Sequence, residues 1–164
     1  MKAIYLIGFM GAGKTTVGKA LSDKLEVPVI DTDEYIEREK KKTIKAIFKE
    51  EGEPAFRDYE SQILRMLPKR YVVITTGGGI VTREENLTWM KQNGLVIYLY
   101  CNTEELLKRL KNDKTRPLIQ QNKEDAITRL LMDRAPLYKQ AHFTIDTSWL
   151  NVDQVVSRIM EQID

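Results

Sequence analysis

The sequence predicts an α/β fold, a parallel sheet with helices on both faces, on the strength of two observations. Short apolar runs alternate with longer amphipathic segments along the 164 residues. The short runs are also nearly continuous in apolar residues, which is typical of parallel strands buried on both faces. The expected strands are Ile4–Ile7, Val29–Ile30, Tyr71–Thr75, Val96–Tyr100 and His142–Ile145.

Apolar residues at helical spacing predict the helices between and after these strands. The apolar stripes occupy residues 17–25, 44–48, 63–67, 106–110 and 152–159. Two capping pairs indicate where helices begin, Thr82 with Glu85 and Asn151 with Gln154. Strand and helix therefore alternate in the manner of βαβ units.

Composition places the chain among soluble globular proteins and favours one domain spanning residues 1–164. A net charge of +2 argues against a dedicated nucleic-acid binder. The N-terminal apolar run is too short for a signal peptide or a membrane span. Cys101 is the only cysteine, which excludes an intramolecular disulfide and indicates a reducing compartment. We therefore expect a cytoplasmic monomer with no membrane or nucleic-acid partner.

The strongest chemical signal is the run G-F-M-G-A-G-K-T-T at residues 8–16, which fits the phosphate-loop pattern. It follows a predicted strand and opens a predicted helix. Its glycines let consecutive backbone N–H groups converge, and the helix start adds its positive dipole end. We expect Lys14 to bridge the β- and γ-phosphates of a nucleotide and Thr15 to ligate Mg²⁺. The alternative is a glycine-rich turn without a ligand, which the strand and helix on either side make the weaker interpretation.

Switch GTPases, motor ATPases and small-molecule kinases all carry a phosphate loop, so other residues must decide between them. Asn122-Lys123-Glu124-Asp125 matches the N-K-x-D pattern by which GTPases read guanine. A poor strand candidate precedes it, and the companion D-x-x-G pattern does not occur in the sequence. We therefore interpret residues 122–125 as the solvent-exposed start of a helix.

Two carboxylates, Asp31 and Asp33, end the second predicted strand. Ligands of open α/β sheets bind beyond the carboxyl ends of the strands, and alternate residues of an extended chain point the same way. We expect Asp31 to face the shell of a Mg²⁺ ion and Asp33 to accept the proton of an acceptor hydroxyl. The structural alternative for Asp33 is a cap on a helix that begins at Glu34.

The third predicted strand ends in Gly77-Gly78-Gly79, which exposes backbone where side chains would block a close approach. We expect the Gly78 N–H to meet an anionic or hydroxylated substrate. Arg57 and Arg134 are the candidate anion ligands, with Glu60 placed to hold Arg57 on the same helix face. Two converging guanidiniums suggest recognition of a carboxylate, and a surface ion pair is the alternative for each.

The polar run Lys111–Pro117 has no apolar period and predicts a mobile loop. Pro117 biases Arg116 toward extended backbone. Closure of such a lid over the nucleotide would bring Arg116 against the phosphates, where it would stabilise charge on the transferring group.

Taken together, these segments closely resemble shikimate kinase, and they follow one another in the same order. They are the phosphate loop, Asp31-Thr32-Asp33, Gly52–Arg57, Gly77-Gly78-Gly79, Arg116-Pro117-Leu118 and Arg134…Tyr138. The resemblance runs from Ile4 to about Asp146. It implies a three-layer P-loop kinase fold like that of nucleoside-monophosphate kinases, with a five-stranded parallel sheet in the order 2-3-1-4-5. It also implies ATP-dependent phosphorylation of the 3-hydroxyl of shikimate, the fifth step of chorismate biosynthesis.

The resemblance also assigns roles to individual residues. It implies that shikimate is bound by Asp33, Arg57, Gly78 and Arg134, with the two arginines on its carboxylate. It implies that ATP is bound by Gly11, Ala12, Gly13, Lys14, Thr15 and Thr16, with Arg109 packing on adenine. Mg²⁺ would lie on Thr15 with Asp31 nearby, and the expected catalytic residues are Lys14, Asp33 and the lid residue Arg116. The substrate-binding helical region would span about residues 33–61 and the lid about residues 111–123.

The sequence departs from the family after the last strand, where members often carry an arginine that helps to hold adenine. Here the segment is Asp146-Thr147-Ser148-Trp149, and Trp149 is expected either to stack on adenine or to join the core. Two rival functions remain open, a gluconate kinase of the same fold and a non-catalytic nucleotide-binding switch. Arg57 with Glu60 favours a cyclic carboxylate as acceptor, and Asp33 favours an enzyme.

Overall fold

A single parallel sheet forms the centre of the computed structural model, which describes residues 1–111 and 123–163. Within these residues the strand order is β2-β3-β1-β4-β5, as the sequence predicts. The strands are β1 (Ala3–Ile7), β2 (Val29–Asp31), β3 (Val73–Thr75), β4 (Gly94–Tyr100) and β5 (Phe143–Asp146). All of β1 is buried, because β3 and β4 pair with it and helices cover its faces. The predicted fold class and strand order are therefore confirmed.

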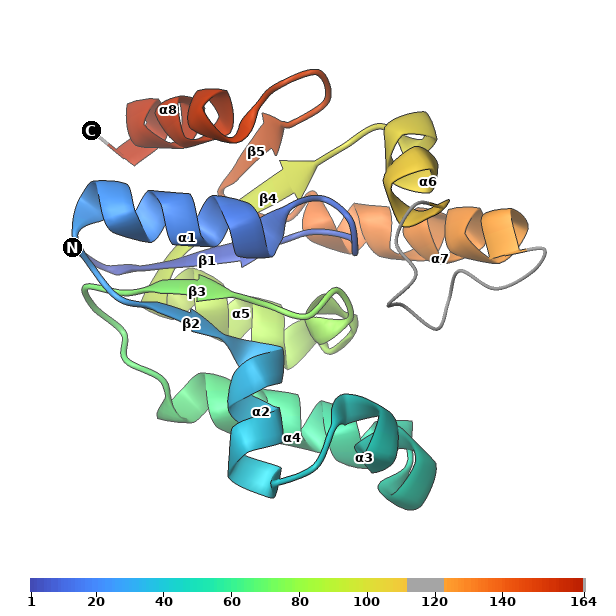
Figure 1. Ribbon diagram of the computed structural model, residues 1–164. Coiled ribbons are helices and arrows are strands. Elements are labelled where there is room, and N and C mark those ends of the chain that lie inside the picture. Colours follow the sequence, from blue (N-terminus) through green and yellow to red (C-terminus); the bar gives the residue numbers. More distant parts are fainter. Residues whose placement is uncertain (112–122, 164) are drawn as a thin grey trace.

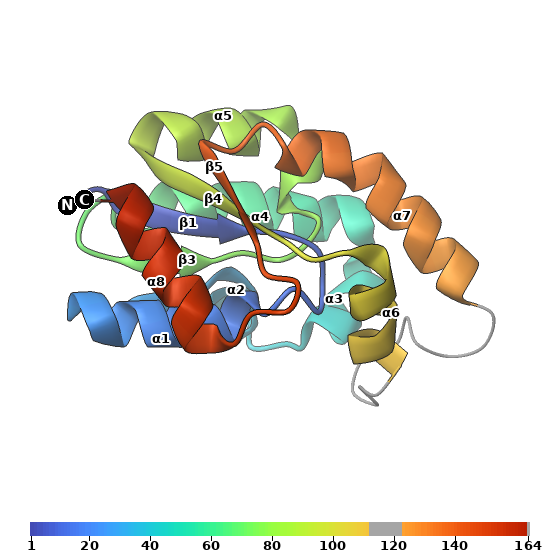
Figure 2. The same ribbon diagram turned by 90° about the horizontal axis from the view of Figure 1, so that it is seen from above.

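Helices cover both faces of the sheet. Figure 1 and the turned view of Figure 2 show α1 and α8 on one face and α5 on the other. The helices are α1 (Lys14–Leu25), α2 (Thr32–Lys40), α3 (Ile44–Glu51), α4 (Glu53–Met66), α5 (Glu84–Asn93), α6 (Thr103–Lys111), α7 (Lys123–Tyr138) and α8 (Val152–Ile163), with a 3₁₀ turn η1 (Ile80–Thr82). Across these residues, no helix has the length and apolar character that a membrane span needs.

The apolar stripes of the sequence lie on the buried faces of these helices. Val17 and Leu21 of α1 are buried against the sheet, and Ile63 and Leu64 of α4 pack in the same core. The β1 and β3 strands end beside each other, so that the turns following them lie at one edge of the sheet. This edge carries the phosphate loop and the three consecutive glycines.

Of three local features predicted from the sequence, one is confirmed and two differ in the structure. The Asn151–Gln154 capping box is confirmed, because each backbone N–H bonds the other side chain at 2.9 and 2.8 Å. The Thr82–Glu85 box is wrong: Thr82 ends η1 and its hydroxyl donates to the Gly79 carbonyl at 2.7 Å, while α5 begins at Glu84. The third strand, β3, begins at Val73, two residues later than predicted. Tyr71 has a left-handed φ of 53° and cannot be part of a strand.

The last three residues of the N-K-x-D match, Lys123 to Asp125, open α7, and Asn122 lies outside the described residues. Glu124 and Asp125 lie in the first turn of that helix and are exposed. Acidic residues suit this position because they complement the positive end of the helix dipole. This placement agrees with the interpretation as an exposed helix start.

Candidate functional site

The phosphate loop links β1 to α1, and its backbone geometry depends on glycine. Gly11 and Gly13 have φ values of 84° and 92°, in the left-handed region that other residues rarely adopt. Gly13 caps α1, which begins at Lys14 and directs its free N–H groups into the loop. The Lys14 ammonium folds over the loop and donates to the carbonyls of Gly8 and Phe9, the second at 2.9 Å. The loop is therefore arranged to receive an anion, with a cation already beside it.

The other predicted nucleotide ligands lie where such an anion would sit. Ala12 is a buried residue of the loop, and Thr15 and Thr16 are exposed residues in the first turn of α1. A cleft of about 260 Å³ adjoins the loop. Its lining includes Gly11, Ala12, Gly13, Thr16, Arg109, Thr147 and Asn151.

Arg109 is fixed at the side of this cleft. It donates to the Gly11 carbonyl at 3.1 Å and to the Glu105 carboxylate at 3.3 Å. The α6 helix thereby binds the phosphate loop from the outside, close to where the adenine contact is predicted. That contact with adenine stays a prediction.

Trp149 is not part of the core. Its side chain is 80% exposed and its φ is 66°, so the predicted core alternative is wrong. A turn closed by the Leu150 N–H and the Thr147 carbonyl, at 3.2 Å, holds the residue away from the protein interior. Because Thr147 and Leu150 line the cleft, Trp149 is left at its margin, and stacking on adenine remains a prediction.

Asp31 and Asp33 both lie at the carboxyl end of β2, but their surroundings differ. Asp31 Oδ1 accepts the backbone N–H groups of Asp33 and Glu34 at 3.0 and 3.1 Å, and Oδ2 accepts the Thr75 hydroxyl at 2.8 Å. Asp31 is therefore the N-cap of α2, which begins at Thr32. The structural alternative that made Asp33 the cap of a helix starting at Glu34 is wrong, because the helix begins two residues earlier.

The Asp33 carboxylate has a buried oxygen and, unlike that of Asp31, does not cap a helix. Burial, followed by the neighbouring charge of Asp31, raises the pKa of Asp33 to about 6, against the opposing effect of Lys14 and Arg57. Among the described residues, its buried Oδ1 has no hydrogen-bond partner. A carboxylate with this pKa is still mostly ionised at pH 7 and is a stronger base than an exposed aspartate, which suits a proton acceptor.

Arg57 lies on α4 and is held by two acidic residues of the same helix. Its Nη1 is 2.7 Å from Glu60 Oε1, and its Nη2 is 3.1 Å from Glu53 Oε1. The Arg57 side chain is only 13% exposed and that of Glu60 is fully buried. Burial raises the pKa of Glu60 to about 7, and the charge of Arg57 opposes this rise. Arg57 is therefore a fixed and partly buried cation rather than an ordinary surface ion pair.

Arg134 approaches from α7 and is also buried. Its guanidinium lies over the Phe9 ring, 5.9 Å from the centroid, and its charge opposes the rise that burial causes in the pKa of Tyr138, one turn later. The Tyr138 hydroxyl in turn donates to the Gly78 carbonyl at 2.5 Å. Within the described residues, Arg134 Nε has no partner. A buried guanidinium with an unused donor is costly unless an anion or another acceptor completes it, which fits a carboxylate ligand.

The glycine run 77–79 is the place where these groups meet. Gly77 faces the Asp33 carboxylate, Gly78 faces Arg134 Nη1, and Gly79 faces the Arg57 guanidinium. Gly78 also lies against the phosphate loop, near Met10 N and Gly8 O. The structure therefore brings the predicted acceptor residues together beside Lys14 instead of scattering them over the surface.

The remaining predicted site residue, Arg116, lies outside the described residues, as do residues 112–122 of the predicted lid. Its contact with the phosphates stays a prediction.

The fit for Mg²⁺ rests on few protein ligands. In the part of the chain that the structure describes, no group of three His, Cys, Asp or Glu side chains could hold a metal. Mg²⁺ typically binds one or two protein ligands and completes its shell with water and substrate phosphates. The exposed hydroxyl of Thr15 beside the loop, and Asp31 reached through water, fit that mode of binding.

Sequence reasoning missed the functional context of Tyr138, Phe9 and Glu53. Tyr138 follows Arg134 by four residues on α7, a spacing that places both on one helix face and could have suggested their contact. Glu53 precedes Arg57 by the same spacing and offered the same signal. No sequence signal places Phe9 under Arg134, because the two come from elements far apart in the chain.

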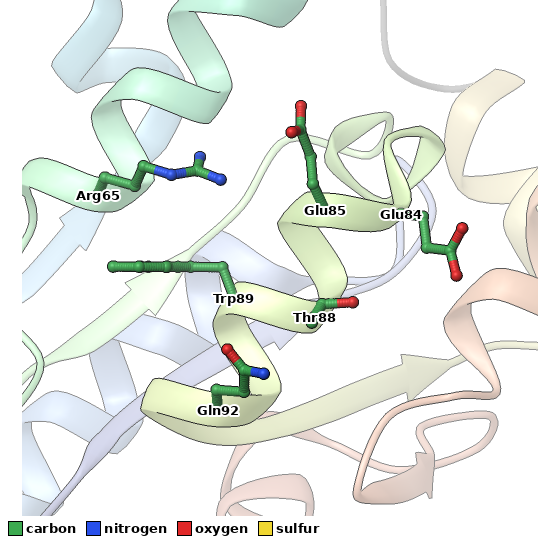
Figure 3. A pocket seen from close by; sticks show the side chains of 6 residues that line it. All are labelled: Arg65, Glu84, Glu85, Thr88, Trp89 and Gln92. Atoms are coloured by element: carbon green, nitrogen blue, oxygen red, sulfur yellow. The ribbon is translucent and has the colours of Figure 1, made fainter.

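Another hollow, of about 390 Å³, lies between α4 and α5, and none of the predicted site residues lines it (Figure 3). Arg65 lies over the Trp89 ring, 5.2 Å from its centroid, and donates to the Ser61 carbonyl at 2.8 Å. Lys69 Nζ lies 4.7 Å from the centre of the same ring. These contacts pack α4 against α5, and this packing already explains why the side chains lie there.

Comparison with known proteins gives a consistent result over the whole chain. The family model described as "Shikimate kinase" matches residues 10–164. A shikimate kinase of Bacillus cereus (strain G9842) is 51% identical over 164 residues, which are 100% of this chain and 99% of that protein. A shikimate kinase of Thermodesulfovibrio yellowstonii is 42% identical, over 100% of this chain and 96% of that protein.

Solved structures are similar in the same way. A shikimate kinase from Acinetobacter baumannii, solved in complex with shikimate, has a TM-score of 0.92 and 42% identity, covering 99% of this chain and 93% of that one. A shikimate kinase from Aquifex aeolicus has a TM-score of 0.84 and 36% identity, covering 98% and 95%. The similarity therefore includes the phosphate loop, the glycine run and the helices around them.

Proposed function

Since the chain belongs to the shikimate kinase family, we propose that it transfers the γ-phosphoryl group of ATP to the 3-hydroxyl of shikimate. It is an ATP-dependent phosphotransferase with an alcohol acceptor, in the pathway to chorismate and the aromatic amino acids. One observation carries the acceptor assignment: Arg57 and Arg134 approach adjacent glycines of one turn, beside the phosphate loop. Two guanidiniums in that position match a small carboxylate that must lie next to a triphosphate.

The nucleotide side is expected to work through backbone and charge. Gly11 to Thr16 surround the phosphates with N–H donors, and Lys14 neutralises the β- and γ-oxygens. Mg²⁺, held by Thr15 and by Asp31 through water, supplies further positive charge when it is bound with the nucleotide. Arg109 packs against adenine at the cleft beside the loop, and Arg116 reaches the γ-phosphate from the lid.

The acceptor side fixes shikimate for an in-line attack. Arg57 and Arg134 bind its carboxylate, the Gly78 N–H meets the ring substituents, and Asp33 accepts the proton of the 3-hydroxyl. Phosphoryl transfer needs alignment and charge neutralisation more than covalent help, so these contacts account for most of the catalysis. The helical region of about residues 33–61 forms this side, and residues 111–123 form the lid of the single domain.

A gluconate kinase is the nearest rival because it shares the phosphate loop. We separate the two by measuring ADP release with Mg·ATP across shikimate, gluconate and other polyols and hydroxy acids. Shikimate is expected to be the preferred acceptor, because Arg57 is fixed by Glu60 in a pocket suited to a rigid carboxylate. Faster turnover of gluconate would contradict the assignment, and ATP binding without any acceptor-dependent ADP release would indicate a nucleotide-binding switch.

We also propose that the protein works as a cytoplasmic monomer without nucleic-acid or membrane partners. Support comes from the site, whose predicted acceptor residues come from one chain, and from the small net charge of +2. Sedimentation at micromolar concentration tests the oligomeric state, with and without shikimate.

A further inference from the structure

Each glycine of the run 77–79 faces a different side chain of the acceptor site. A β-carbon on Gly77 would lie 2.7 Å from Asp33 Oδ1, and one on Gly79 would lie 2.4 and 2.5 Å from the two terminal nitrogens of Arg57. A β-carbon on Gly78 would lie 3.3 Å from Arg134 Nη1. The first two distances are shorter than any ordinary contact with carbon, and the third is only slightly tight.

Backbone conformation does not explain these glycines. None of the three belongs to the glycines with positive φ, and Gly79 has φ −94° and ψ 4°, a conformation open to residues with side chains. Glycine is therefore needed at 77 and 79 for space rather than for its dihedral freedom.

The turn itself is poorly able to move away from an added methyl group. The Gly77 N–H donates to the Thr32 hydroxyl at 3.2 Å, and the Gly77 carbonyl accepts from Ile80 at 3.2 Å. The Gly79 carbonyl accepts both the backbone N–H and the hydroxyl of Thr82, at 3.1 and 2.7 Å. Ile80, which follows directly, is fully buried. Because the backbone is held at both ends, the side chain opposite each glycine must give way instead.

We propose that Gly77 and Gly79 are positioning residues of the acceptor site: their missing β-carbons leave the space in which Asp33 and Arg57 reach the substrate. This inference rests on the proposed function and assigns each glycine a separate kinetic role. A side chain at 79 displaces the carboxylate-binding guanidinium and breaks its 2.7 Å contact with Glu60. A side chain at 77 displaces the proton acceptor first, because its β-carbon would lie 2.7 Å from Asp33 Oδ1 but 3.2 Å from Oε2 of Glu60, the carboxylate that holds Arg57.

Steady-state kinetics of three alanine variants tests the proposal, with shikimate and Mg·ATP varied separately. Gly79→Ala is expected to raise KM for shikimate at least about tenfold, with a smaller change in kcat. Gly77→Ala is expected to lower kcat at least about tenfold, with a smaller change in KM for shikimate. Gly78→Ala is the comparison within the turn. Its β-carbon needs the smallest shift, and because the Gly78 N–H is itself a predicted contact with shikimate, its effect is expected on KM for shikimate and should be smaller than that of Gly79→Ala. KM for ATP should stay within about threefold of wild type in all three.

A double-mutant cycle removes Arg57, the side chain that Gly79 accommodates. In an Arg57→Ala background, Gly79→Ala should cause no further loss, because nothing remains for its methyl group to displace, while Gly77→Ala should keep its full effect on kcat. Should Gly79→Ala fail to fold, Arg57→Ala is expected to restore folding. Wild-type KM in Gly79→Ala, or an equal penalty with and without Arg57, would overturn the inference. Failure of the wild-type protein to phosphorylate shikimate would instead overturn the proposed function.

Discussion

Two glycine-rich turns lie beside each other at one edge of the sheet, and they require glycine for different physical reasons. In the phosphate loop, Gly11 and Gly13 adopt left-handed φ values of 84° and 92°, so that the backbone itself becomes the ligand. In the run 77–79 the φ values are ordinary, and the missing side chains make room for groups that arrive from α2, α4 and α7. We propose that the phosphate loop binds the phosphates of the nucleotide, while the glycine run arranges the side chains that bind the acceptor.

The largest effect is expected on the phosphate side, where Lys14 supplies the charge. Lys14→Met should lower kcat by about 10³-fold or more, because it removes a contact with charge that develops in the transition state. KM for shikimate should change little, since the acceptor is bound by the other turn. Coupled ADP release measures both constants. Lys19→Met, an exposed position on the same helix, is the control; an equal loss in both variants would contradict the role given to Lys14.

Arg57→Ala tests the acceptor side of the comparison. We expect it to weaken shikimate binding by ~2–5 kcal/mol, or roughly 30-fold to several thousand-fold, because a desolvated partner of the carboxylate is lost. Calorimetric titration of shikimate into the nucleotide-free protein measures this directly. Arg83→Ala removes a more exposed ion pair of the same length, 2.7 Å from Asp58, and should leave the affinity unchanged. Wild-type affinity in Arg57→Ala would refute the carboxylate assignment.

Asp33→Asn tests the acceptor side through the free energy of unfolding and its dependence on pH. Because burial raises the pKa of Asp33 to about 6 from an ordinary value of 3.8, the folded state binds its proton more tightly than the unfolded state. The free energy of unfolding therefore falls as pH rises from about 4 to about 6, and the full cost is present above that range. We expect Asp33→Asn to gain about 1–3 kcal/mol of stability at pH 8, a gain that shrinks toward pH 4, while kcat falls.

Urea unfolding at several pH values measures this gap, and Asp23→Asn, on an exposed position of α1, is the matched control. An Asp33→Asn variant that is less stable than wild type at pH 8 would show that the carboxylate is satisfied in the folded protein and is not held there for function.

The smallest expected effect concerns Tyr138, whose hydroxyl donates to the Gly78 carbonyl in the glycine run. Tyr138→Phe should raise KM for shikimate by roughly 2- to 13-fold, the equivalent of about 0.5–1.5 kcal/mol for a lost hydrogen bond. Tyr5→Phe is a matched control, because its buried hydroxyl has no hydrogen-bond partner among the described residues. A similar KM for shikimate in both variants would show that the Tyr138 hydroxyl does not contribute to acceptor binding.

The phosphate side was predictable from the sequence because it is local. The run 8–16 combines strand, glycines, lysine and helix start in one short segment, and the fold class follows from equally local periodicity. The cap on α2 was misassigned for the same reason that helix ends are generally hard to place: a shift of two residues in the start of α2 exchanges the roles of Asp31 and Asp33.

The acceptor side could be predicted only as a set of candidate residues. Arg57, Asp33 and Arg134 were each recognisable, but which of them meet depends on how three helices pack around one turn. The Tyr138–Gly78 hydrogen bond joins residues 60 positions apart, and nothing in the sequence near either one indicates the other. Non-local packing of this kind leaves no periodic or capping signal.

The central claim is that two fixed guanidiniums beside the phosphate loop select a carboxylate acceptor. The most direct measurement compares kcat/KM for shikimate with that for its carboxamide, in wild type and in Arg57→Ala. We predict that wild type prefers the carboxylate by at least about 30-fold and that Arg57→Ala loses most of this preference. Equal kcat/KM for the two acceptors in wild type would contradict the claim.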